Sequence, residues 1–355
     1  MAPKGKKKSP PVMSHEFIIQ NHADIVAVIA MVFMLGLMVE FLHPLASSFI
    51  AISHNVTYEE VGADGSDLVL YRPGMKDVLA VFFYTLIMIL AHAVIQEFIL
   101  DKFNKKQNLS KAKFAKFNES GQLAAFYTFS FVFAGSLLWN AFKSEGSYAK
   151  LISSFWTGFP DSHFAMEWAL KLFYILQISY WVHVFPELYF TKTKKEDMAA
   201  KVEYASLYLL AIIAGYAMHY HKVLLVLLAI HYLVEGTFHV ARVFYFLDLQ
   251  HIAQGGFKLW SYLFVLVRLA TVAIAVLTFW FGFGQVHENN PSSSTSMVAR
   301  VTSLSAICIM QAWMSWNFIT FQMKRKRDAA GIPQQKKAMK AANGSPSTKG
   351  SKKKQ

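Results

Sequence analysis

The chain contains little cysteine and little charge. Cys308 is the only cysteine among 355 residues, so no intramolecular disulfide can form, and its place in an apolar run indicates packing rather than redox chemistry. Charged residues make up 16% of the chain and hydrophobic residues 54%, with a mean hydropathy of +0.32. This composition argues against a soluble enzyme and predicts an integral membrane protein.

The chain also lacks the motifs of common active sites. It contains no recognisable nucleophile–base pair, glycine-rich phosphate loop or cysteine–histidine cluster. A net charge of +13 would suggest a nucleic-acid partner in a soluble protein. Here most Lys and Arg residues lie between or beyond apolar runs, as the positive-inside rule predicts for cytosolic segments, so no DNA partner is expected.

Eight apolar runs are long enough to cross a hydrocarbon core of roughly 30 Å as helices. Eight crossings place both termini on one side of the membrane, and the lysine-rich connections predict that this side is the cytosol. The sequence therefore predicts an all-α, polytopic helix bundle. The predicted spans are residues 25–42, 77–100, 123–139, 164–185, 202–218, 223–246, 257–283 and 297–321.

The first part of the chain supports this topology. Lysines near the start of segment 1–24 predict that it is cytosolic. The loop within region 25–115, which holds the first two spans, carries the sequon Asn55-Val56-Thr57, which can be glycosylated only on the luminal side. We therefore expect a glycan on Asn55. The sequons at Asn108 and Asn118 lie in a cytosolic connection and should stay unmodified.

The last segment, 325–355, is predicted to be a disordered, basic, cytosolic tail. Its Lys, Ala, Gly, Ser and Pro residues cannot bury enough apolar surface to fold. The basic cluster at 324–327 would be attracted to anionic lipid or ribosomal RNA. Lys352 and Lys353 match the form of a dilysine retrieval signal for the endoplasmic reticulum. The alternative, a merely soluble lysine-rich tail, remains open.

The predicted span 223–246 carries ionisable residues inside an apolar run. Glu235, His239 and Arg242 follow His231 at offsets of four, eight and eleven, so a helix places all four on one face. A charge at the bilayer centre costs at least about 2.5 kcal/mol, so such residues indicate a functional polar pocket, here for a lipid or a nascent chain. Arg268 in the next span is the expected partner of Glu235.

Two other interpretations of this face remain open. His231, Glu235 and His239 could ligate a metal, but they lack the His-Glu-x-x-His spacing and a fourth ligand, so no metal or cofactor is expected. Glu235 could instead form a buried pair with His239 or Arg242, with the Arg242 side chain extending to the lipid headgroups.

Other polar residues in the spans are expected to have structural roles. Glu167 and Lys171 are spaced for an i,i+4 pair, and the fourth span should end at Pro186. The residues expected to cap that span are His183 and Glu187, and those expected to hydrogen-bond between helices are Gln311 and Asn317.

Several stretches in order along the chain resemble the family of translocating chain-associating membrane proteins, TRAM. They are residues 14–26 (SHEFIIQNHADIV), the Asn55 sequon, 92–97 (HAVIQE), 116–123 (KFNESGQL), 185–190 (FPELYF) and 192–197 (KTKKED). The resemblance implies a non-enzymatic protein of the endoplasmic reticulum membrane beside the Sec translocon channel and the ribosome–nascent chain complex. It would contact signal sequences and transmembrane segments, and its polar face could perturb the neighbouring bilayer.

Residues 116–324 also resemble the six-helix TLC domain that this family shares with ceramide synthases. In those enzymes a His-His pair and a following His-Asp are thought to carry acyl transfer. The pair's positions correspond to Tyr204 and Ala205 here, and His231 is followed by Tyr232, with Glu235 near the place of a second Asp. The resemblance thus implies that catalysis is lost. The alternative is a TLC-type lipid-binding protein or sphingolipid acyltransferase.

Overall fold

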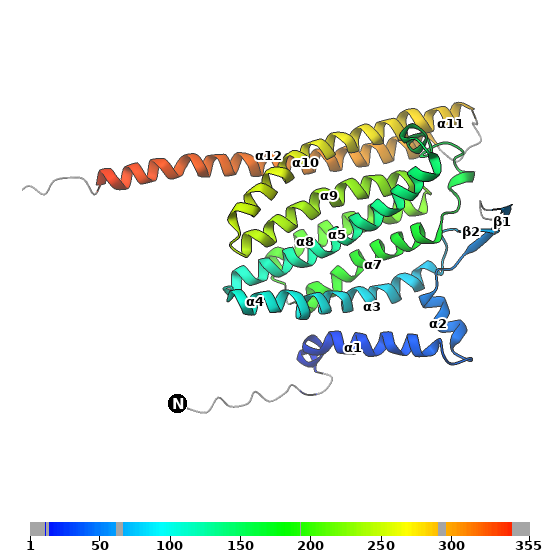
Figure 1. Cartoon of the computed structure of the whole chain (residues 1–355), viewed down its shortest axis with the longest axis horizontal. Helices are drawn as coiled ribbons and strands as arrows, with labels where there is room; N and C mark the ends of the chain where they lie inside the picture. The colour runs from blue at the N-terminus through cyan, green and yellow to red at the C-terminus, as the bar shows by residue number, and fades with distance from the viewer. Residues whose placement is uncertain (1–10, 12–13, 62–66, 192, 290–295, 343–355) are drawn as a thin grey trace, which may run out of the picture.

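The computed structural model describes residues 11, 14–61, 67–191, 193–289 and 296–342. Lys352 and Lys353 lie outside the described residues. The long helices run side by side and form a bundle (Figure 1), which confirms the predicted all-α, polytopic architecture. They are α1 (His15–Gly36), α3 (Asp77–Ile95), α5 (Lys111–Glu145), α7 (Trp168–Phe190), α8 (Lys195–Ala217), α9 (His221–Phe246), α10 (Gln250–Ala275) and α12 (Met297–Ala342).

Shorter elements extend or connect these helices. A π-helical turn, η1 (Gln96–Leu100), joins α3 to α4 (Asp101–Gln107), and a second, η3 (Val276–Gly282), joins α10 to α11 (Phe283–Asn289). The shorter helical elements are α2 (His43–Ile50), η1 (Gln96–Leu100), α4 (Asp101–Gln107), α6 (Tyr148–Ser153), η2 (Asp161–His163), η3 (Val276–Gly282) and α11 (Phe283–Asn289).

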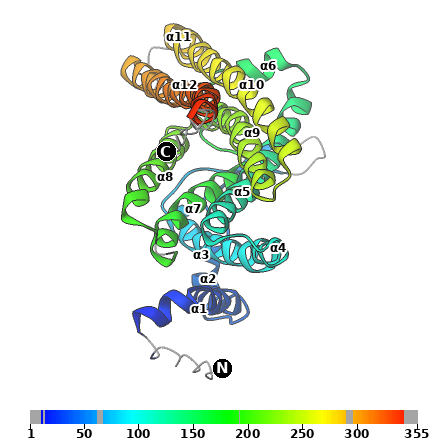
Figure 2. The same cartoon turned by 90° about the vertical axis from the view of Figure 1, so that its left-hand side faces the viewer.

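Seven helices in the described part of the chain are long and apolar enough to cross a membrane. The predicted span at 164–185 is not among these seven; it corresponds to α7, which has 23 residues but carries polar side chains. Lys171, Gln177, Ser179 and His183 are all buried on it. Because α7 is surrounded by α3, α5 and α8, its polar groups face protein rather than lipid. Figure 2 shows α7 between these helices.

Helix α5 is much longer than the predicted span at 123–139. Ser110 caps its start by accepting a hydrogen bond from the Lys113 backbone N–H, and Gly146 ends it with φ +69°. The first turns of α5 are polar, so hydropathy alone does not assign them to the predicted span. They nevertheless pack inward, since Phe117 lies in a buried cluster with Leu100 and Phe246. Tertiary contacts therefore extend this helix beyond its apolar run.

A small β-hairpin lies in the loop where the sequence predicts only a polar connection. Strand β1 (Asn55–Val61) pairs antiparallel with β2 (Asp67–Tyr71), and Asn55 is opposite Tyr71. Tyr71 also forms a backbone bridge to Met166, just before α7. The hairpin lies at one end of the bundle, here named the hairpin end. The start of α1, α4 and the end of α12 lie at the other, named the α4 end (Figure 1).

A buried ion pair joins the hairpin end to the bundle. Lys171 Nζ lies 2.8 Å from Asp77 Oδ1 and donates to the carbonyl oxygens of Ser53 (2.8 Å) and Arg72 (2.7 Å). The other Asp77 oxygen accepts from the Tyr216 hydroxyl at 2.8 Å. Lys171 is fully buried, and its three donors find three acceptors. The predicted side-chain pair with Glu167 is therefore wrong, because Asp77 is the acidic residue that reaches the buried ammonium group in the described structure.

Helix α7 does not end at Pro186 as the sequence predicts. Pro186 lies inside the helix, which continues to Phe190. Glu187 does not cap the helix; its carboxyl group lies 3.3 Å from Nε2 of His92 on α3. His183 Nδ1 bonds to the Tyr180 carbonyl of its own helix. Packing against α3 thus holds the last turn of α7 despite the backbone donor that proline removes.

Helix α12 continues to Ala342, although the sequence predicts disorder from residue 325. Lys, Arg, Gln, Ala and Met, which form helices well, make up much of this extension. A helix that already exists in the membrane also avoids the cost of nucleation, so its extension needs no buried face.

The connection between α5 and α7 is folded around His163. Its Nε2 contacts the Ser154 carbonyl oxygen and its Nδ1 the Ser162 hydroxyl, each at 3.0 Å. Burial, together with the positive charge of Lys222, lowers the pKa of His163 to about 4. The ring is therefore neutral at pH 7.

Asn55 is the residue at the hairpin end that we predict to be glycosylated, and its side chain is exposed. Asn55→Gln should remove one glycan, seen as a loss of the endoglycosidase-sensitive shift on a gel after synthesis into microsomes. Asn108→Gln and Asn118→Gln, at the α4 end, should leave the shift unchanged. If instead only Asn108→Gln abolished the shift, the α4 end would be luminal and the predicted topology would be wrong.

Candidate functional site

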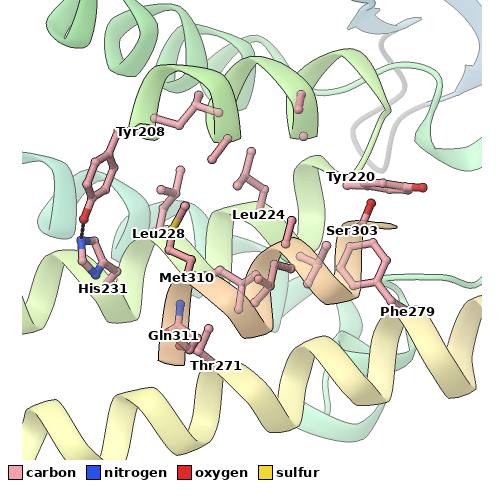
Figure 3. A pocket seen from close by; sticks show the side chains of 18 of the residues that line it. Tyr208, Tyr220, Leu224, Leu228, His231, Thr271, Phe279, Ser303, Met310 and Gln311 are labelled. Carbon is pink, nitrogen blue, oxygen red and sulfur yellow. Dashed lines mark hydrogen bonds between the residues drawn. The ribbon is translucent and has the colours of Figure 1, made fainter. Parts of the chain in front are cut away.

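An apolar cavity of about 220 Å³ lies between α8, α9, α10 and α12 (Figure 3). Its walls are mainly aliphatic side chains, including Leu224, Leu228 and Met310. Ala211 on α8 and Ala306 on α12 line the cavity and are also exposed, so it opens to the surface between these two helices. Because both helices are apolar enough to span the membrane, the opening faces lipid.

One end of the cavity is polar. There Tyr208 of α8 hydrogen-bonds to Nε2 of His231 on α9 (Figure 3). Arg268 of α10 donates from Nη2 to His231 Nδ1 at 3.1 Å and from Nη1 to Gln311 Oε1 of α12 at 2.8 Å. His231 and Arg268 are only 7% and 5% exposed. One arginine thus connects α9, α10 and α12.

The hydrogen bonds continue away from the cavity into the core. The Tyr204 hydroxyl donates to Tyr208 at 3.2 Å and also contacts the Tyr127 hydroxyl of α5 at 3.2 Å. The Tyr208 ring stacks on Trp181 of α7, with centroids 4.4 Å apart. The polar chain therefore crosses the bundle from α5 to α12. It consists of Tyr127, Tyr204, Tyr208, His231, Arg268 and Gln311.

The direction of these bonds leaves two donors free. Arg268 can only donate, so His231 Nδ1 must accept, and the neutral ring then carries its hydrogen on Nε2 toward Tyr208. The Tyr208 oxygen accepts from both His231 and Tyr204, so its own hydrogen has no acceptor within the described part of the chain. Arg268 Nε also has no partner among the described residues. Such a cavity favours a ligand with an apolar body and a hydrogen-bond acceptor.

The four residues of the predicted polar face on α9 do not form one site. His231 joins the polar chain, whereas the buried His239 ring stacks on Tyr127, with centroids 5.7 Å apart. Arg242 lies over the rings of Phe238 and Phe246 at 5.5 and 5.8 Å. The four residues do lie on one face of the α9 helix. They lie on different turns of it, however, so each contacts different neighbouring helices or side chains.

Glu235 does not pair with the residues that the sequence suggests. Among the described residues, the Glu235 side chain makes no ion pair or hydrogen bond with Arg268, His239, Arg242 or any other residue. The predicted Glu235–Arg268 pair is therefore not formed as a direct contact, because Arg268 donates to His231 and Gln311. Nor does any group of three or more His, Cys, Asp or Glu residues in the described ranges come together in a way that could hold a metal ion.

Sequence reasoning found His231, Arg268 and Gln311 but missed the three tyrosines of the polar chain. Gln311 forms the interhelical bond expected of it, but Asn317 is exposed and makes none within the described part of the chain. Tyr127, Tyr204 and Tyr208 were not predicted. The i,i+4 spacing of Tyr204 and Tyr208 is a signal that could have placed both hydroxyls on one face of α8.

Comparisons with known proteins agree with this arrangement. The model of the TRAM, LAG1 and CLN8 family, described as a TLC domain, matches residues 116–320, which include α5 and α7 to α10 and the membrane-spanning part of α12. The chain belongs to this family. Translocating chain-associated membrane protein 2 of Mus musculus is 37% identical over 332 residues, covering 92% of this chain and 86% of the relative. The Homo sapiens protein of the same name is 36% identical over the same shares.

Tyr204 and Ala205 occupy the positions at which the resemblance to ceramide synthases implies a catalytic histidine pair. Tyr204 is a member of the polar chain, and Ala205 is 1% exposed in the aromatic core. Neither is a general base at neutral pH. His231 remains at the cavity, held between a tyrosine and an arginine.

Gln311→Leu should destabilise the protein, because it removes the oxygen acceptor of Arg268 Nη1 and leaves a buried charge less satisfied. A loss of about 1–3 kcal/mol in the free energy of unfolding is expected. Thermal unfolding in detergent measures it. The matched control, Asn317→Leu on the exposed side of the same helix, should unfold at an unchanged or higher temperature. Equal losses in both variants would contradict the role of the polar chain.

Proposed function

We propose that this protein is a non-enzymatic accessory factor of protein translocation. It acts in the endoplasmic reticulum membrane beside the Sec translocon channel and contacts signal sequences and transmembrane segments as they leave the ribosome–nascent chain complex. The observation that carries the proposal is the 37% identity to translocating chain-associated membrane protein 2 over 92% of this chain and 86% of the relative. The similarity spans the whole bundle, not only its TLC domain.

The cavity between α8 and α12 is the proposed contact point for these segments. Its volume of about 220 Å³ is below the roughly 300–1,000 Å³ of pockets for drug-sized ligands, so it admits side chains or part of an acyl chain but not a helix. A passing apolar helix would lie along the opening and insert one or two side chains. An unpaired polar group of a weakly apolar segment would meet the Tyr208 hydroxyl.

This mechanism differs from direct perturbation of the bilayer by the α9 face. His231 and His239 are buried, and the polar chain points into the bundle. A side chain that does not reach lipid cannot hydrate it directly. The polar groups would therefore act on a segment that enters the cavity rather than on the surrounding membrane.

Site-specific photocrosslinking tests the contact. A photoreactive phenylalanine analogue at Ala306, beside the opening, should crosslink to a signal sequence of a stalled nascent chain in reconstituted membranes. The same analogue at Ala312, which is exposed on α12 but does not line the cavity, should crosslink weakly. Equal yields at both positions, or none at Ala306, would refute the cavity as the contact site.

A second candidate function is lipid binding in the same cavity. It is favoured by the Tyr208 hydroxyl hydrogen, which has no acceptor among the described residues and lies at the end of an apolar space, an arrangement that suits an acyl chain with an ester or carboxylate group. Lipid binding requires no catalytic residues at positions 204 and 205, whereas a sphingolipid acyltransferase would.

Native mass spectrometry of the purified protein would reveal such a lipid. Tyr208→Phe, which keeps the ring on Trp181 but removes the hydroxyl, should lower lipid retention about fivefold, the effect of one hydrogen bond. Tyr148→Phe, at an exposed position outside the cavity, is the matched control. Unchanged retention in Tyr208→Phe would exclude this binding mode.

A further inference from the structure

A second hollow lies at the α4 end of the bundle, where α9 ends, α10 begins and α12 passes. We name it the basic groove. Its volume is about 1,200 Å³, and none of the residues that line it also lines the cavity between α8 and α12. Its cations are Arg242, Lys258, Arg325 and Lys326, and its aromatic residues are Phe238, Tyr245, Phe246, Phe257, Trp260, Tyr262, Phe318 and Phe321.

The positive charge of the basic groove is not neutralised by its own walls. Within the described part of the chain, no acidic residue lines the groove. The nearby Asp248, in the connection between α9 and α10, is paired with Lys113 at 3.6 Å. Arg242 packs on the faces of Phe238 and Phe246, and no carboxylate reaches it within the described residues. Four cations around one hollow whose described lining holds no acidic residue attract an anion.

The groove changes from basic to apolar along its length. On α12, Arg325 and Phe318 are seven residues apart, and on α10 so are Lys258 and Val265, which is roughly 10 Å of helix in each case. Val265 is 49% exposed on a helix that is apolar enough to span the membrane. The cations therefore lie at the membrane surface, and the apolar end reaches into hydrocarbon.

We propose that the basic groove binds an anionic phospholipid. The phosphate and any further negative group of its head lie among Lys258, Arg325 and Lys326, and its acyl chains follow Trp260 and Phe318 toward Val265. Basic hollows between membrane helices suit such headgroups because the charge attraction adds to the burial of the chains.

The same features argue against other anions. An RNA strand or an acidic peptide would satisfy the cations but would leave the apolar end of the groove exposed, and neither enters the hydrocarbon region. A zwitterionic lipid would fill the apolar end but would add no net charge opposite four cations. Only an amphiphile with a net negative head matches both ends.

Lipid retention in native mass spectrometry tests the assignment on the full-length protein. Phosphatidylserine and phosphatidylcholine with identical acyl chains are added to the protein in detergent, and phosphatidylserine should be retained at least about fivefold more. The triple variant Lys258→Gln/Arg325→Gln/Lys326→Gln should lose about a hundredfold in phosphatidylserine affinity, at about fivefold per cation. All three side chains are exposed, so the fold should be unaffected, as a thermal unfolding curve would verify.

The matched control removes the same charge at the same end of the bundle. Lys102→Gln/Lys105→Gln/Lys106→Gln on α4 changes three exposed lysines outside the groove and should retain phosphatidylserine as the unmodified protein does. Equal retention of the two lipids, or equal losses in the two triple variants, would overturn the proposal. Displacement of the lipid by glycerophosphoserine or by single-stranded RNA at equal concentration would also overturn it, because the chains would then contribute nothing.

Discussion

A hydrocarbon core supplies no hydrogen-bond partners, so each polar side chain that faces inward must find its partner in the bundle itself. Arg268 meets this requirement with His231 and Gln311, and through them it holds α9, α10 and α12 in one arrangement. Lys171 meets it with Asp77 and two carbonyl oxygens at the hairpin end. Removing Asp77 would leave the buried Lys171 without its counter-charge, and removing Gln311 would leave the buried Arg268 with one hydrogen bond fewer, and both losses are costly. These contacts therefore specify which helices are neighbours.

Not every inward-facing donor finds a partner, and the donors that remain determine which ligands the cavity between α8 and α12 favours. Arg268 Nε and the Tyr208 hydroxyl hydrogen are left over after the described contacts are made. They lie at the end of an apolar space that opens between α8 and α12. At the membrane surface, in the basic groove, Arg242 packs on the aromatic rings of Phe238 and Phe246. Two amphiphilic sites thus share α9 but face different neighbours and different depths of the bilayer.

Much of the fold follows from the chain alone. Apolar runs predict the membrane helices, and motifs such as residues 116–123 and 185–190 indicate the family that the comparisons establish. The helix ends were less predictable. Polar turns at the start of α5, Pro186 in α7 and the basic extension of α12 are all helical, since contacts with neighbouring helices or continuation of an existing helix outweigh local preference. The hairpin escaped prediction because its strands are short and carry charge.

The sequence by itself determined that the chain lies in a membrane, which segments form its apolar helices and which side chains are too polar to face lipid. Periodicity even placed His231, Glu235, His239 and Arg242 on one face of α9 correctly. Only the tertiary structure decided their partners, because a buried donor bonds to whichever acceptor the packing of helices brings within about 3 Å. Arg268 therefore meets Gln311, more than forty positions away in α12, and Lys171 meets Asp77 of α3 and not Glu167 one turn earlier.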